Sequence, residues 1–132
     1  MESYAELKRI FIRFVNIVQE ELMKKNEYKV TIKAVSDDKL TFVFLDDTID
    51  MTFGYVSNAR GEVFGKMNFE LNRERLDSVT TKENILTLFF DENLRIMDSI
   101  EAPKIDVNFE YKMVVLFILT EVIDRYLNLK KT

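Results

Sequence analysis

Apolar side chains recur every three or four residues near both ends of the chain. Residues at this spacing share one face of an α-helix, so the pattern predicts amphipathic helices. The first helix is expected over residues 3–25, and its apolar positions are Tyr4, Leu7, Phe11, Phe14, Val18 and Leu22. The second is expected over residues 108–129, after Pro103, where Asn108 can cap the first turn.

Between these helices the apolar pattern changes first to a period of two, which is typical of half-buried β-strands. Apolar and polar residues alternate over 28–35 and again over 49–55. Residues 40–45 are apolar on both faces, as in a strand that is central in a sheet or covered on both sides. Short Asp-rich segments separate the three runs. The pattern therefore predicts a three-stranded antiparallel meander after the first helix.

Residues 60–74 fit two kinds of element. Alternating apolar residues suggest a fourth strand, whereas Val63, Met67 and Leu71 also share one helical face. The segment from Phe69 onward is rich in residues that favour helix, although each nearby glycine costs a helix roughly 1 kcal/mol relative to alanine. We predict a helix here, with a strand as the alternative.

Residues 84–101 are predicted to form a β-hairpin. A strand-like apolar run ends at Phe90, an acidic turn follows at 91–93, and a second apolar run returns from Leu94. The competing interpretation is a helix that begins at residue 81, because Thr80 could form a capping box with a glutamate three residues later.

Together these elements predict an α+β fold in the order helix, three strands, helix, two strands, helix. The five strands would form one antiparallel sheet packed against the helices. The chain has 132 residues, so we expect residues 1–132 to form a single domain.

Charge and hydropathy restrict the partners and the compartment. The formal net charge is −4, and basic residues are interspersed with acidic ones, which disfavours nucleic acid and anionic membranes as partners. The longest apolar run, 113–119, is far shorter than the roughly 20 residues that a membrane-spanning helix needs. The first residues do not resemble a signal peptide. We therefore expect a cytoplasmic protein.

The sequence lacks the residues on which most catalytic and metal-binding sites depend. The sequence contains neither histidine nor cysteine, the most common general base and the typical zinc ligands, and it has no glycine-rich phosphate loop. Its densest carboxylate group is Asp46, Asp47 and Asp50, which we interpret as turn residues rather than a metal site. We expect no enzyme activity, no catalytic residues, no metal and no cofactor.

The predicted order of elements resembles the type III secretion chaperone-like fold, and within it the YbjN-like family of bacterial sensory-transduction regulators. The similarity also involves three segments, FELNRE at 69–74, FDEN at 90–93 and DSIEAP at 98–103. This resemblance implies a small homodimer without catalytic residues that offers its sheet surface and helix grooves to a protein segment.

Several apolar residues fall on the second face of their predicted strands or helix, where either a helix or a partner must cover them. The candidate partner-binding residues are Val43, Leu45, Val56, Phe64, Phe89 and Phe90. They favour a non-enzymatic, dimeric protein-interaction domain of chaperone-like or regulatory type. Two alternatives remain, a domain that holds a small apolar ligand in its phenylalanine-rich interior, and an inhibitor or immunity-type protein whose acidic turns bind a basic partner.

Overall fold

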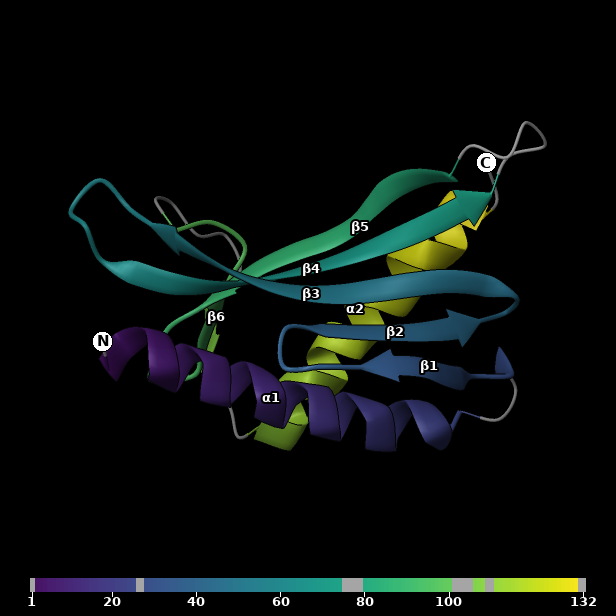
Figure 1. Cartoon of the computed structure of the whole chain (residues 1–132), viewed down its shortest axis with the longest axis horizontal. Helices are drawn as coiled ribbons and strands as arrows, with labels where there is room; N and C mark the ends of the chain where they lie inside the picture. The colour runs from purple at the N-terminus through teal and green to yellow at the C-terminus, as the bar shows by residue number, and fades with distance from the viewer. Residues whose placement is uncertain (1, 26–27, 75–79, 101–105, 109–110, 131–132) are drawn as a thin grey trace.

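The chain folds as one antiparallel β-sheet between two helices in sequence (Figure 1). This computed structural model describes residues 2–25, 28–74, 80–100, 106–108 and 111–130. The elements are α1 (Glu2–Met23), β1 (Thr31–Val35), β2 (Lys39–Phe44), β3 (Asp47–Ser57), β4 (Val63–Glu74), β5 (Thr80–Phe90), β6 (Arg95–Met97), β7 (Asp106–Asn108) and α2 (Tyr111–Lys130). The strands lie in the sheet in their sequence order, so each pairs only with its neighbours along the chain.

The α+β class is confirmed, but the predicted count of five strands and three helices is wrong. The described residues form seven strands and two helices. The largest error is the middle helix, because residues 63–74 form β4. β4 pairs with β3 along one side and with β5 along the other. The resemblance to YbjN-like proteins depended on that middle helix, so the order of elements now departs from the one that suggested it.

The predicted hairpin is confirmed as β5 and β6, joined by a tight turn, although β5 begins earlier, at Thr80, and β6 covers only Arg95–Met97. Residue 101, the end of the predicted hairpin, lies outside the described residues. The Asp91 carboxylate organises this turn, because its Oδ1 accepts hydrogen bonds from the backbone N–H groups of Asn93, at 2.8 Å, and Arg95, at 3.0 Å. Leu94 takes a positive φ of 65°. The acidic residues of the turn therefore have a local structural role.

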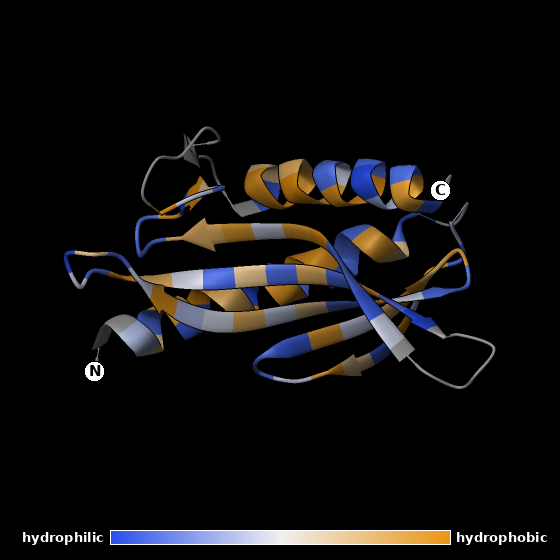
Figure 2. Cartoon of the chain, turned by 90° about the horizontal axis from the view of Figure 1, so that it is seen from above, coloured by the Kyte–Doolittle hydropathy of each residue, from blue (hydrophilic) through white to orange (hydrophobic). Residues whose placement is uncertain are grey.

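Both helices pack against the same face of the sheet. Phe11 of α1 stacks on Phe53 of β3, Phe14 of α1 packs edge-on against Phe90 of β5, and Tyr126 of α2 packs edge-on against Phe44 of β2. Figure 2 shows hydrophobic and hydrophilic residues alternating along the strands, as expected for a sheet with one covered face. The sheet residues buried on this face are Leu40, Phe42, Phe44, Ile49, Met51, Met67, Phe69, Leu71, Leu86, Leu88, Phe90 and Ile96.

The two short edge strands differ from expectation. β1 begins at Thr31, whereas the predicted strand began at residue 28. Nearly all residues of β1 are exposed, whereas a half-buried strand was predicted. Asp106–Asn108 forms β7, although Asn108 was predicted to cap the last helix, which instead begins at Tyr111. The brief alternation of apolar residues around Val107 is the sequence signal for this strand.

Candidate functional site

The candidate site is the face of the sheet that points away from the helices, which we call the open face. Its residues occupy the strand positions that alternate with the buried ones. They are Thr41, Val43, Thr48, Asp50, Thr52, Val56, Phe64, Lys66, Asn68, Glu70, Asn72, Lys82, Thr87 and Phe89. The open face has an apolar end, near the β3–β4 hairpin, and a polar end, near the β2–β3 turn.

Three half-buried side chains form the apolar end, which we call the apolar patch: Val56, Phe64 and Phe89. Val56 and Phe64 are direct cross-strand partners. Phe89 lies opposite Lys66, two residues along β4 from Phe64 and on the same face. Such diagonal positions are within reach of aromatic side chains. All three were candidate partner-binding residues, so the structure brings half of that set together.

The other three candidate residues lie elsewhere. Val43 is on the open face but opposite Thr48, towards the polar end. Leu45 sits in the β2–β3 turn with a positive φ of 49° and packs against the core. The prediction for Phe90 is wrong, because this residue is 0% exposed beneath α1. Phe89 and Phe90 are consecutive in a strand and must point to opposite faces, so only one of them could face a partner.

A buried carboxylate dominates the polar end. Asp50 of β3 is only 3% exposed although it lies on the open face. The Thr41 hydroxyl donates to Asp50 Oδ1 at 2.6 Å, and the Asn72 side-chain amide donates to Asp50 Oδ2 at 2.6 Å. Lys39 Nζ lies 3.7 Å from Asp50 Oδ2. Strand β2 thus contributes Lys39 and Thr41 to this network, β3 contributes Asp50, and β4 contributes Asn72.

The network keeps Asp50 ionised. Burial by itself would raise the pKa of this carboxyl, because a low-dielectric surrounding disfavours the charged form. The hydrogen bonds from Thr41 and Asn72 and the charges of Lys39 and Lys82 outweigh burial, so that the pKa of Asp50 lies below its ordinary value of 3.8.

Around this network lies a polar pocket of about 840 Å³. It is lined by Lys33, Lys39, Asp46, Asp47, Thr48, Asp50, Asn72, Arg73, Lys82 and Lys130. Five of the lining side chains are cationic and three are carboxylates, whereas the whole chain carries a net charge of −4. The pocket is therefore a locally basic site on an acidic protein.

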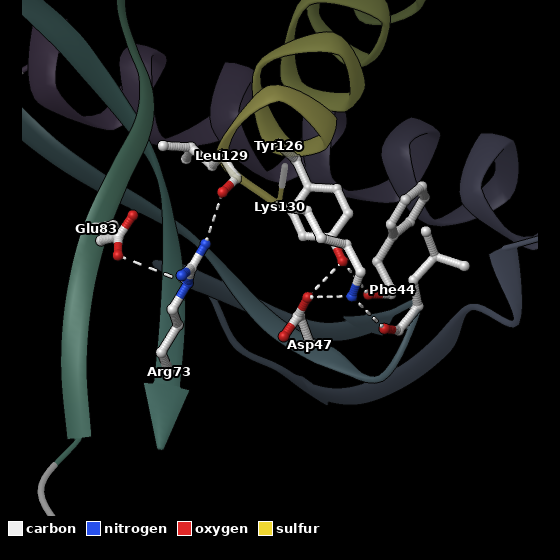
Figure 3. A network of polar contacts seen from close by, with 8 residues as sticks. Phe44, Asp47, Arg73, Glu83, Tyr126, Leu129 and Lys130 are labelled. Carbon is white, nitrogen blue, oxygen red and sulfur yellow. Dashed lines mark hydrogen bonds and ion pairs between the residues drawn. The ribbon is translucent and has the colours of Figure 1, made fainter. Parts of the chain in front are cut away.

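The end of α2 forms part of the pocket wall through two sets of polar contacts (Figure 3). The Tyr126 hydroxyl donates to Asp47 Oδ2 at 2.5 Å and lies 3.2 Å from the Phe44 carbonyl oxygen, while Lys130 Nζ lies 3.1 Å from Asp47 Oδ2. Arg73 donates to the Leu129 carbonyl oxygen at 3.1 Å and pairs with Glu83 at 3.6 Å. These contacts fix the last turn of α2 against the β2–β3 turn and β4.

We expect Tyr126→Phe to lower the free energy of unfolding by about 1.5 kcal/mol, because the Phe44 carbonyl and the Asp47 carboxylate lose a buried hydroxyl donor. Burial and the neighbouring Asp47 carboxylate raise the pKa of Tyr126, so the hydroxyl stays protonated and able to donate. Urea unfolding at neutral pH measures the effect. Tyr55→Phe is the matched control, since its hydroxyl also donates to a backbone carbonyl but the residue is 43% exposed. Equal losses in the two variants would contradict the prediction.

Sequence reasoning missed the pocket. Asp50 was interpreted as a turn residue, and Asn72 fell within the helix predicted over 60–74. The structure instead places Asn72 and Lys82 opposite each other on β4 and β5. The available signal was the apolar alternation of 63–71, which as a strand places Asn72 on the face opposite to that of Leu71.

The comparisons with known proteins give no family. No protein-family model, curated protein or solved structure matches the chain. Within the described ranges, the structure has no group of three Asp or Glu side chains that could hold a metal ion. Neither described helix is long and apolar enough to cross a membrane.

Proposed function

We propose that the protein is a non-enzymatic protein-interaction domain that forms a homodimer through the apolar patch on its open face. The observation that carries this proposal is the position of Val56, Phe64 and Phe89 on the side of the sheet opposite both helices. Of the neighbouring open-face residues, Thr52, Asn68 and Thr87 are polar and uncharged, and Lys66, opposite Phe89, is charged. An apolar centre with a polar rim is the usual composition of a protein interface.

The exposed edge at β1 is a poorer surface for self-association. This strand has only five residues, and its pairing with β2 is irregular between Ile32 and Ala34. Lys33 occupies the irregular position. Short, bulged edges that carry lysine oppose the addition of a further strand. Face-to-face association through the apolar patch is therefore the better-supported arrangement.

No specific observation favours the apolar-ligand domain or the inhibitor-type protein. The void among the core residues of α1, α2, β2 and β3 holds only about 10 Å³, about one water molecule, so this part of the interior has no room for an apolar ligand. The acidic turn residues Asp47 and Asp91 are engaged within the chain, the first by Tyr126 and Lys130 and the second by its own turn. They are thus less available to a basic partner.

Light scattering across a concentration series tests the proposal. We expect a dimer at high micromolar concentration, and we expect Phe64→Ser combined with Phe89→Ser to weaken dimerisation at least tenfold, because large aromatic side chains dominate interface energetics. Val43→Ser is the matched control, since Val43 is half-buried on the same face but outside the apolar patch.

A wild-type protein that stays monomeric at several hundred micromolar would refute the proposal. So would a double variant that dimerises as strongly as the Val43→Ser control.

A further inference from the structure

A glycine lies on the open face, beside the apolar patch. Gly54 of β3 is directly opposite Lys66 of β4, and directly opposed residues of an antiparallel pair point to the same face. Val56, a member of the apolar patch, is two residues further along β3 and therefore also on this face. Gly54 thus leaves a gap between side chains at the border of the patch.

Neither the backbone conformation nor the packing of a single chain requires a glycine at this position. The φ of Gly54 is not positive, unlike the φ of 83° at Gly61. The pairing of β3 with β4 is regular from Thr48 to Ser57, so Gly54 does not form a bulge. A Cβ at Gly54 would have no atom within 4 Å. Glycine weakens the interior of a strand and often marks a place where a ligand or another backbone approaches closely.

The gap at Gly54 has a bulky counterpart in the same row of the sheet. Lys66 is opposite Gly54 on one side and opposite Phe89 on the other. Neighbouring strands lie about 4.8 Å apart, so Gly54 and Phe89 lie at about equal distances on either side of β4. The row therefore presents a residue without a side chain and a large aromatic residue symmetrically about its central strand.

We propose that two copies of the chain pack open face to open face, with Phe89 of each copy seated over Gly54 of the other. This inference rests on the dimer proposed above and specifies its arrangement. A two-fold axis that runs approximately along β4 exchanges the two sides of the row, so that each phenylalanine faces a gap. Packed sheets commonly lie about 10 Å apart with their strands crossing at about 30°, which this axis allows. A phenylalanine that points across such a distance leaves little room for a facing side chain, and a glycine provides that room.

The same axis assigns positions to two further residues of β4. Phe64 lies on this strand, two residues from Lys66, so the two Phe64 side chains of the dimer meet near the axis and can form an aromatic pair. The two Lys66 side chains also approach each other, and each extends its ammonium group towards solvent. Lys66→Gln is therefore expected to strengthen the dimer about threefold, because it removes a pair of like charges.

Substitutions that exchange the sizes of the two facing residues test the arrangement. Gly54→Leu fills the gap and Phe89→Ala removes the ring, so each single variant should weaken dimerisation about tenfold in light scattering. The two changes combined in one chain restore the match in size, and this double variant should dimerise at least tenfold more tightly than Gly54→Leu. An equimolar mixture of the two single variants should favour the heterodimer in native mass spectrometry, because both of its contacts then avoid a clash.

Two controls separate the contact from effects on folding and from a general effect of size. Val43→Leu enlarges another half-buried side chain of the open face outside the apolar patch, and it should leave the dimer unchanged. Gly54→Leu should unfold in urea at the same midpoint as the wild type at concentrations where both are monomeric, because the position is open in the single chain.

The outcomes distinguish this arrangement from the dimer itself. A wild-type protein that stays monomeric would refute the dimer and the arrangement together. A wild-type dimer that tolerates Gly54→Leu, is not restored by adding Phe89→Ala, or is weakened by Lys66→Gln would overturn the arrangement and leave the dimer standing.

Discussion

Replacement of Gly65 by alanine is expected to lower the free energy of unfolding by about 3 kcal/mol, because an added methyl group overpacks a closed part of the core. Gly65 lies in β4 directly opposite Phe90 of β5. A Cβ at this position would lie 2.5 Å from Phe90 Cε1 and 2.6 Å from Cε2. The Phe90 ring is 0% exposed and lies beneath Phe14 and beside Phe53, so it cannot move aside freely.

Gly54→Ala provides the control for this change. Gly54 lies in the adjacent strand β3, and a Cβ there would have no atom within 4 Å. Urea unfolding should show little change in this variant. Adding Phe90→Leu to Gly65→Ala should recover part of the loss, because the smaller side chain leaves room for the methyl group. Equal stability of the two glycine variants would show that Phe90 does not close this space.

Replacement of Asp50 by alanine is expected to cost about 3 kcal/mol at neutral pH. The Thr41 hydroxyl and the Asn72 amide would lose their buried acceptor, and Lys39 would lose its nearest carboxylate. Asp37→Ala is the control, because Asp37 is exposed in the β1–β2 turn. A surface carboxylate of this kind should change stability by no more than about 0.5 kcal/mol.

The same carboxylate should contribute to the pH dependence of stability. The pKa of Asp50 is lowered in the folded protein, so its contribution is fully present above the ordinary pKa of 3.8 and is lost as pH falls through the lower folded value. Asp50→Asn removes this titration, so its stability should fall less steeply than that of the wild type below about pH 4. Parallel stability curves for the two proteins would contradict the lowered pKa.

The fold was predictable where the apolar period was unambiguous. The long stripe from Leu7 to Leu22 identified α1, and strict alternation identified β3. Residues 63–74 were ambiguous, because their apolar positions satisfy both a period of two and a helical face. Pairing with β3 and β5 makes this segment a strand rather than a helix. In a central strand, the backbone N–H and C=O groups form hydrogen bonds with neighbouring strands on both sides. Such pairing depends on residues distant in sequence and is not contained in the local pattern.

The candidate site was predictable only in part, for a related reason. The apolar patch could be anticipated from apolar residues on the second face of strands, although the choice between Phe89 and Phe90 required the register of β5. The polar network around Asp50 could not be anticipated from the sequence, because Asp50 and Asn72 are 22 residues apart and meet only through the β3–β4 pairing. Their individual residue types are ordinary in turns and connections.

The strictly sequential strand order has a consequence for how the chain folds. Each strand pairs with the next one along the chain, so the sheet can grow by successive local hairpins, each of which closes only a short loop. By contrast, the contact between α1 and α2 joins the two ends of the sequence. Such long-range closure is entropically slow. We therefore expect the docking of α2, with Tyr126 reaching the β2–β3 turn, to be among the last steps of folding.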